Sequence, residues 1–298
     1  MNRSLLPVLL GGLAVTAVLG QPIKVAATNS DLAAITREIG KELVDVSLLL
    51  PPTVDPHSMP LRPSLIQKIR EARLLITIGL DHEPWLPDAI SSSGNARVNP
   101  GGPGYVDCSR GVSLAQIPTG PVDRSRGDLH IFGNTHYWLD PANVKIMAVH
   151  VTQALSGEIP GKREEIRSRA RSFLTGLERR IGEWKTRLGP IAGKKVIAYH
   201  LTFPYLEAFT GIQVVDTIEM RPGIEPSPAH LAKLRDRMKQ EKIRWIIMEP
   251  WYNKQRAVAL ASDVGAEVVV IRPSTPEGKT IGEHLDSLVA VLVKSMGR

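Results

Sequence analysis

The feature that most constrains the fold is one long amphipathic pattern in the middle of the chain. Between residues 162 and 188, apolar side chains recur at steps of three and four, as in a helix with one buried stripe. Pro160-Gly161 precede this pattern and Gly189-Pro190 end it. At about 1.5 Å per residue the helix is roughly 40 Å long, the scale of a whole domain. The stripe consists of Ile166, Ala170, Phe173, Leu174, Leu177, Ile181, Trp184 and Leu188.

Short apolar runs alternate with helical patterns on both sides of this helix. Such alternation is typical of parallel βαβ units. We therefore expect an α/β fold with two Rossmann-like lobes, each a mostly parallel sheet with flanking helices, joined by one long rigid helix. Before that helix, strands are predicted at 23–28, 44–50 and 74–79, and helices at 31–39, 65–72, 84–90 and 141–156. After it, strands are predicted at 195–199, 213–218, 243–248 and 267–271, and helices at 202–209, 228–240, 253–264 and 280–296.

The chain has 298 residues, about the size at which one compact core stops growing. Residues 91–127 are rich in Gly, Pro and Ser and are predicted as mostly loop, with a weak strand at 112–117. Because a packed helix joins the lobes, we expect only small motions at the cleft. The predicted organisation is a signal peptide at 1–20, an N-terminal lobe at 22–158, a linking helix at 160–188 and a C-terminal lobe at 190–298.

The first residues have the pattern of a secretory signal. Arg3 gives a positive start, residues 5–19 are apolar, and the small residues Val18 and Gly20 suit cleavage near Gly20. The apolar run has roughly 15 residues, against about 20 for a spanning helix. No Cys lies near the cleavage point, so a lipid anchor is not indicated. We expect an exported, periplasmic protein.

The charge pattern argues against nucleic acid as a partner. The formal charge is +7, but the basic residues are scattered or interleaved with Glu along 162–187, as on a solvated helix face. With only four Phe there is no basic-aromatic stripe. We expect a monomer. The single cysteine, Cys108, can build neither an internal disulfide nor a thiolate metal site on its own.

Open parallel sheets bind ligands beyond the carboxyl ends of their strands, and three histidines lie at or near such places. His57 lies in the loop after the predicted strand 44–50, His136 just before the helix at 141–156, and His200 at the end of the strand 195–199. A lone histidine is most often a surface or capping residue. Three imidazoles from separate loops, however, suit Zn²⁺ and related first-row ions.

A carboxylate is expected near these imidazoles. Glu249 ends the apolar strand 243–248, where a buried carboxylate is costly unless it is paired or bound to a metal. It is the candidate fourth ligand, and a structural ion pair is the competing interpretation. Asp216 is a weaker candidate within a strand pattern. His82, Glu83 and His130 are candidates for residues that contact and orient the metal ligands without binding the ion themselves.

Six segments form a distinctive set, in order along nearly the whole mature chain. They are Pro51-Pro52-Thr53-Val54-Asp55-Pro56-His57, Gly79-Leu80-Asp81-His82-Glu83-Pro84-Trp85-Leu86, Gly127-Asp128-Leu129-His130 with Gly133-Asn134-Thr135-His136-Tyr137-Trp138-Leu139-Asp140-Pro141, Ala198-Tyr199-His200 with Phe203, Tyr205 and Phe209-Thr210-Gly211, Pro222-Gly223-Ile224-Glu225-Pro226-Ser227-Pro228, and Met248-Glu249-Pro250. Together they resemble the zinc- and manganese-binding substrate-binding proteins of ABC importers, the ZnuA/TroA-like family. The resemblance implies two α/β lobes, a rigid linking helix and a metal held between the lobes by His57, His136 and His200. It implies capture of Zn²⁺, or Mn²⁺, and delivery to an ABC permease, with no enzymatic activity.

The chain departs from the family pattern in three places. Thr135 stands where Pro is usual. Ile271-Arg272-Pro273 replaces a Leu-Asp-Pro segment that often supplies an aspartate ligand, which leaves Glu249 or water as fourth ligand and Arg272 as a possible partner of Glu249. Residues 91–127 lack the His- and acid-rich run of many zinc-specific members. The choice among Zn²⁺, Mn²⁺ and Fe²⁺ therefore stays open.

Two other functions remain in competition. A zinc hydrolase would use the same histidines, with Glu249 as general base, although the chain has no His-Glu-x-x-His element and no Gly-x-Ser-x-Gly elbow. A binder of a siderophore or corrinoid would use the same scaffold, with Trp85, Trp138 and Trp251 lining its cleft.

Overall fold

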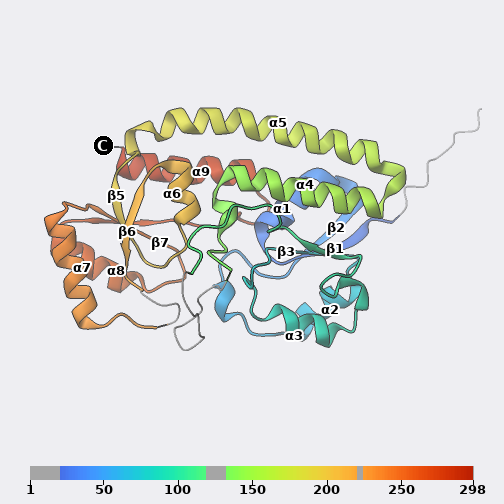
Figure 1. Cartoon of the computed structure of the whole chain (residues 1–298), viewed down its shortest axis with the longest axis horizontal. Coiled ribbons are helices and arrows are strands. Elements are labelled where there is room, and N and C mark those ends of the chain that lie inside the picture. Colours follow the sequence, from blue (N-terminus) through green and yellow to red (C-terminus); the bar gives the residue numbers. More distant parts are fainter. Residues whose placement is uncertain (1–20, 119–131, 220–223, 298) are drawn as a thin grey trace, which may run out of the picture.

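The computed structural model describes residues 21–118, 132–219 and 224–297, which form two α/β lobes side by side under one long helix (Figure 1). In the N-terminal lobe the strands are β1 (Ile23–Ala27), β2 (Val44–Leu48), β3 (Leu74–Thr77) and β4 (Tyr105–Asp107). Its helices are α1 (Ser30–Gly40), α2 (Pro63–Glu71), α3 (Leu86–Ser93) and α4 (Pro141–Glu158), with short 3-10 turns η1 (Lys41–Leu43), η2 (Pro56–Ser58), η3 (Ala96–Val98) and η5 (Tyr137–Leu139).

The C-terminal lobe repeats the same arrangement. Its strands are β5 (Lys195–Ala198), β6 (Gln213–Thr217), β7 (Trp245–Met248) and β8 (Glu267–Val270), and its helices are α6 (Pro204–Thr210), α7 (Pro228–Gln240), α8 (Lys254–Val264) and α9 (Ile281–Met296). The sheets are wholly parallel, in the orders β2-β1-β3-β4 and β6-β5-β7-β8. In both, the first strand of the lobe is central, so the loop after it lies in the middle of the ligand-binding edge.

The linking helix α5 (Arg163–Leu188) runs along both lobes, with 3-10 turns η6 (Pro160–Lys162) and η7 (Gly189–Ile191) at its ends (Figure 1). Its buried residues fall on the predicted stripe: Ile166, Ala170, Leu177, Trp184 and Leu188. They belong to one apolar cluster that continues from α1 and α4 of the N-terminal lobe into α6 and α9 of the C-terminal lobe. The lobes therefore share a core.

Hydrogen bonds also cross directly between the lobes. The indole nitrogen of Trp138 donates to the carbonyl oxygen of Pro273 at 2.9 Å. The hydroxyl of Tyr205 donates to the carbonyl oxygen of Asn134 at 2.9 Å and accepts from the backbone nitrogen of Ala115 at 3.0 Å. These bonds and the shared core give a physical basis for small rather than large relative motion of the lobes.

The predicted fold class is confirmed, and the helix predicted at 228–240 has those bounds. The strand predicted at 112–117 is wrong: the fourth strand of the first sheet is β4, earlier in the same Gly- and Pro-rich stretch. Only three residues of β4 pair with β3, which is too short a stretch to show an alternating apolar and polar pattern in the sequence. The predicted signal peptide at 1–20 lies outside the described residues. Among the described helices, none is long and apolar enough to cross a membrane.

Candidate metal centre

His57 is presented by a short turn beyond β2. The carboxylate of Asp55 caps this turn by accepting the backbone N–H of His57 at 2.9 Å, and Pro56 occupies its first position. Capping and a fixed proline φ favour a single loop conformation. This turn places the imidazole of His57 at the junction of the two lobes.

His136 is buried just before α4, and Asn134 orients its ring. The amide nitrogen of Asn134 donates to the carbonyl oxygen of Leu201 at 2.6 Å and to Gln116 at 3.1 Å. The side-chain oxygen of Asn134 therefore faces His136, 3.0 Å from its backbone nitrogen and 3.1 Å from Nδ1. With the proton on Nδ1, the lone pair is on Nε2, which is the tautomer a metal ligand needs.

His200 follows the central strand β5 of the other lobe and is also buried. Its Nδ1 lies 3.5 Å from a carboxylate oxygen of Glu219, which follows β6. A carboxylate behind one ring nitrogen makes the other nitrogen a better electron donor. Glu219 was not predicted from the sequence, although it follows a predicted strand by the same logic as Glu249.

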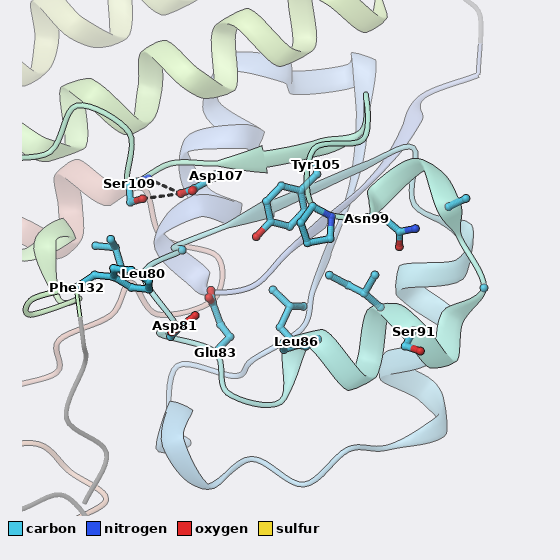
Figure 2. Close-up of a pocket in the computed structure, with 16 residues that line it drawn as sticks. Leu80, Asp81, Glu83, Leu86, Ser91, Asn99, Tyr105, Asp107, Ser109 and Phe132 are labelled. Carbon is cyan, nitrogen blue, oxygen red and sulfur yellow. Dashed lines mark hydrogen bonds between the residues drawn. The ribbon is translucent and has the colours of Figure 1, made fainter. Parts of the chain in front are cut away.

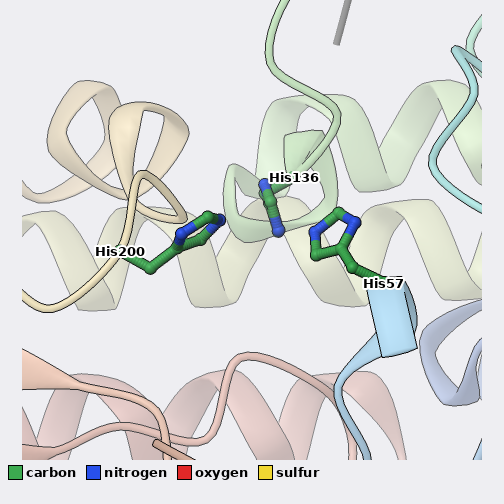
Figure 3. A group of neighbouring side chains, drawn as sticks. All are labelled: His57, His136 and His200. Atoms are coloured by element: carbon green, nitrogen blue, oxygen red, sulfur yellow. The ribbon is translucent and has the colours of Figure 1, made fainter. Parts of the chain in front are cut away.

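The structure brings these three histidines together. One ring nitrogen from each lies within 4.8 Å of the others, and the ring centroids are 5.9 to 6.1 Å apart. Figure 3 shows the rings turned towards one another from three separate segments. Two ligands at about 2.1 Å from one ion lie at most about 4.2 Å apart, so binding requires little closure.

Glu249 lies on the His200 side of this triad and is completely buried after β7. The hydroxyl of Thr202 donates to its Oε1, while Oε2 has no hydrogen-bond partner among the described residues. Burial raises the pKa of this carboxyl to about 7, and the proximity of His200 partly opposes that shift. Glu249 is not part of the group whose ligand atoms lie within 4.8 Å of one another.

The other residues predicted near the site are placed differently. Glu83 is buried behind β3, where the backbone N–H of Ile78 donates to it at 3.0 Å and burial raises its pKa to about 7. Arg272 is exposed, and the described ion pairs include none between it and Glu249. His130 lies outside the described residues. His82 is buried beside the triad, 5.8 Å from His57 and 5.4 Å from His136 between ring centroids.

Two cavities differ sharply in size and place. One of about 830 Å³ lies in the N-terminal lobe beside α3, bordered by Glu83, Tyr105 and Asp107 (Figure 2). The other, between the lobes, measures about 20 Å³ and is lined by His82, His136, Trp138 and Trp251. That is roughly room for one water molecule. Trp85 packs in a separate core cluster of the N-terminal lobe and is not one of its lining residues.

Two α/β lobes bridged by a single helix, with imidazoles meeting between them, define a two-lobed substrate-binding protein. The family described as zinc-uptake complex component A, periplasmic (ZnuA), matches residues 25–294, and the chain belongs to that family.

Individual relatives agree with this assignment. The high-affinity zinc uptake system protein ZnuA of Bacillus subtilis is 27% identical over 262 residues, covering 87% of this chain and 80% of the relative. The manganese ABC transporter substrate-binding lipoprotein PsaA of Streptococcus mitis is 24% identical, covering 77% of this chain and 73% of the relative. The crystal structure of a zinc-bound ZnuA deletion mutant superposes with a TM-score of 0.77 at 23% identity, covering 92% of this chain and 98% of that chain.

Proposed function

We propose that this chain is the substrate-binding component of an ABC-type metal importer, which captures Zn²⁺, or Mn²⁺, between its lobes and delivers it to a membrane permease. The observation that carries the proposal is the meeting of His57, His136 and His200 from three distant segments at the lobe junction. Family membership and the named relatives support the same function.

The three imidazoles are proposed as metal ligands, with the carboxylate of Glu249 as a further donor. Borderline nitrogen ligands suit Zn²⁺, and the carboxylate would also suit Mn²⁺. Only neutral imidazoles bind metal, so affinity should fall as pH drops below about 6.5. The carboxylates of Glu219 and Glu249 are buried near His200, so a bound divalent cation would offset their negative charge.

The remaining features of the proposal follow from family membership and sequence. The chain is proposed to be exported through a signal peptide cleaved near Gly20, to act as a monomer, and to have neither a catalytic role nor a nucleic-acid partner. The relatives support metal uptake and not the hydrolase alternative. A siderophore or corrinoid is far larger than the junction cavity of about 20 Å³.

The test is metal binding by single-site variants. Purified protein stripped of metal should bind one Zn²⁺ per chain by elemental analysis and calorimetry, and competition with Mn²⁺ should rank the two ions. His57→Ala and His136→Ala should each weaken binding strongly. His150→Ala is the matched control, because His150 lies on α4 and bonds to the carbonyl oxygen of Arg110, away from the triad. Wild-type affinity in both triad variants would remove the chemical basis of the proposal.

A further inference from the structure

Away from the metal centre, another cavity lies where α1, α5 and the loop before α9 meet. Figure 1 shows α5 lying over α1 and α9, and the three helices pack against one another, so both lobes and the linking helix border this cavity. It measures about 640 Å³, within the range of sites that hold small organic ligands. Its basic lining residues come from all three elements: Arg37 and Lys41 near the end of α1, Arg169 from α5, and Lys279 from the loop.

Most of these positive charges have no opposite charge beside them. Lysine ion pairs in the described chain are those of other lysines, so neither Lys41 nor Lys279 has a carboxylate partner there. Arg37 donates to a backbone carbonyl oxygen at 2.8 Å and keeps its full charge uncompensated. Only Arg169 is paired, with two glutamates outside the lining. Three cations therefore face one cavity without a counter-ion from the described residues.

The surroundings do little to offset this excess of positive charge. The one carboxyl in the lining, that of Glu38, accepts the backbone N–H of Ile281 at 3.1 Å, and burial raises its pKa. The linking segment 160–188, which forms one wall, has nine basic and four acidic residues and so holds most of the formal charge of +7. Such a field attracts anions to the cavity.

Lys41 is held at this cavity in a strained backbone conformation. Its φ of +47° and ψ of −126° are those of the first central residue of a type II′ turn, where glycine is preferred. A side chain at positive φ lowers stability relative to glycine, and residues strained in this way cluster at functional sites. The chain thus carries a long cationic side chain at a position where glycine would be more stable.

We propose that this cavity binds a phosphate ester, with Arg37, Lys41 and Lys279 contacting the phosphate oxygens. Guanidinium and ammonium groups form the strong, charge-assisted hydrogen bonds that hold phosphate in proteins. Ser168 and Ser172 add hydroxyl groups to the wall formed by α5. Inorganic phosphate alone would fill little of 640 Å³, so the remaining space suits the organic part of an ester. The ester is either a soluble molecule or the headgroup of a phospholipid.

Binding of the soluble form is tested by titrating the metal-free chain with glycerol phosphate and following backbone amide chemical shifts. The shifts should saturate and should centre on Lys41, Ser168 and Lys279. Lys41→Gln and Lys279→Gln, at exposed positions, should each weaken binding by about tenfold, as expected for loss of one charge-assisted hydrogen bond. Lys239→Gln, at an exposed position of α7, is the charge-matched control and should bind like wild type.

The headgroup form is tested by cosedimentation with vesicles of phosphatidylglycerol, against vesicles of phosphatidylcholine. If a phospholipid supplies the phosphate, wild type and Lys239→Gln should sediment with the anionic vesicles, and Lys41→Gln and Lys279→Gln should do so less. Binding of glycerol phosphate without sedimentation would support the proposal with a soluble ester as the ligand.

Lys41→Gly separates binding from folding. It should raise the urea midpoint by relieving the strained φ and yet weaken phosphate binding as Lys41→Gln does. The proposal is overturned if neither glycerol phosphate nor anionic vesicles bind, or if Lys239→Gln weakens binding as much as the cavity variants. Zn²⁺ affinity should be unchanged in Lys279→Gln, because this inference is independent of metal capture by the triad.

Discussion

Thr275, in the loop between β8 and α9, donates both its backbone N–H and its hydroxyl to one carboxylate oxygen of Asp31, at 3.1 and 2.7 Å. Asp31 lies in the first turn of α1, in the other lobe, and is almost wholly buried. The second oxygen of Asp31 accepts from the side-chain amide of Asn29 at 3.2 Å. A buried carboxyl thus joins the two lobes through hydrogen bonds.

The first prediction concerns the pH dependence of this contact. Burial raises the pKa of Asp31 from 3.8 to about 6. Between these values the folded chain holds a proton that the unfolded chain has lost, so this contribution to stability is complete below about pH 4 and is lost as pH rises through 6. Its size is roughly 3 kcal/mol. Because Glu83 and Glu249 also have raised pKa values in this range, the contribution of Asp31 is measured as the difference in pH slope between metal-free wild type and an Asp31 variant in urea unfolding from pH 4 to 7.

Asp31→Asn should remove that part of the pH slope. In the variant an amide nitrogen replaces the carboxylate oxygen that accepts from Asn29, which changes stability at every pH. The comparison therefore uses the pH slope of the free energy of unfolding and not its absolute value. Asp45→Asn, at an exposed position of β2, serves as control and should keep the wild-type slope. Parallel slopes for wild type and Asp31→Asn would show that Asp31 does not titrate in this range.

The second prediction is that Glu249→Gln moves apo stability and metal affinity in opposite directions. Glutamine keeps an acceptor for the hydroxyl of Thr202 and removes a charge from a carboxyl whose pKa burial raises to about 7. Since a raised carboxyl pKa costs stability above that pH, the metal-free variant should gain up to roughly 3 kcal/mol at pH 8. Zn²⁺ affinity should fall by roughly tenfold or more.

Denaturant unfolding of the metal-free chain and Zn²⁺ competition titrations measure these two effects. Glu267→Gln, at an exposed position of β8, should change neither. Unchanged Zn²⁺ affinity in Glu249→Gln would mean that the carboxylate has no part in holding the ion.

The third prediction compares two glycines with similar backbone conformations. Gly79 has φ +76°, and an added Cβ would lie 2.3 Å from a carboxylate oxygen of Asp107, whereas Gly94 has φ +68° and open space around it. Gly94→Ala should lower the free energy of unfolding by about 1–2 kcal/mol, because alanine is strained at positive φ and meets no other atom. Gly79→Ala should cost roughly 1–3 kcal/mol more through the clash. Equal losses in urea unfolding would contradict the close approach of Asp107.

The fourth prediction tests a polar contact between the lobes. Trp138→Phe leaves the carbonyl oxygen of Pro273 without its indole donor and should destabilise the chain by about 1–3 kcal/mol beyond the loss of ring area. Trp85→Phe is the control, because the buried indole nitrogen of Trp85 has no partner among the described residues. The difference between the variants in denaturant midpoint isolates the hydrogen bond, and no difference would show that it contributes nothing.

Much of the fold could be predicted because it follows from local patterns. The stripe on α5 and the alternation of strands and helices each require only neighbouring residues to be known. The strand β4 was missed because its three residues pair through backbone bonds at a sheet edge and carry no pattern of their own. Parallel-sheet geometry, which places ligands at the carboxyl ends of strands, points to His57 and His200, whereas His136 precedes a helix and was supported as a candidate by the resemblance to the family.

The side chains that contact the outer nitrogens of the histidine rings could not be predicted from the sequence. Glu219 and Thr135 reach His200 and His82 only after chain segments far apart have packed together. The placement of Arg272 shows the same limit: its position along the chain suggested a partner for Glu249, yet the side chain points to solvent while Glu249 is fully buried. The direction in which a side chain leaves a loop depends on tertiary packing.

The apolar cluster that passes from α1 through α5 to α9 has a consequence for how the molecule denatures. Since one apolar cluster spans both lobes, we expect heat to melt both in a single cooperative transition, with equal calorimetric and van 't Hoff enthalpies. A cation anchored at their seam would then delay the melting of every helix, including those farthest from it.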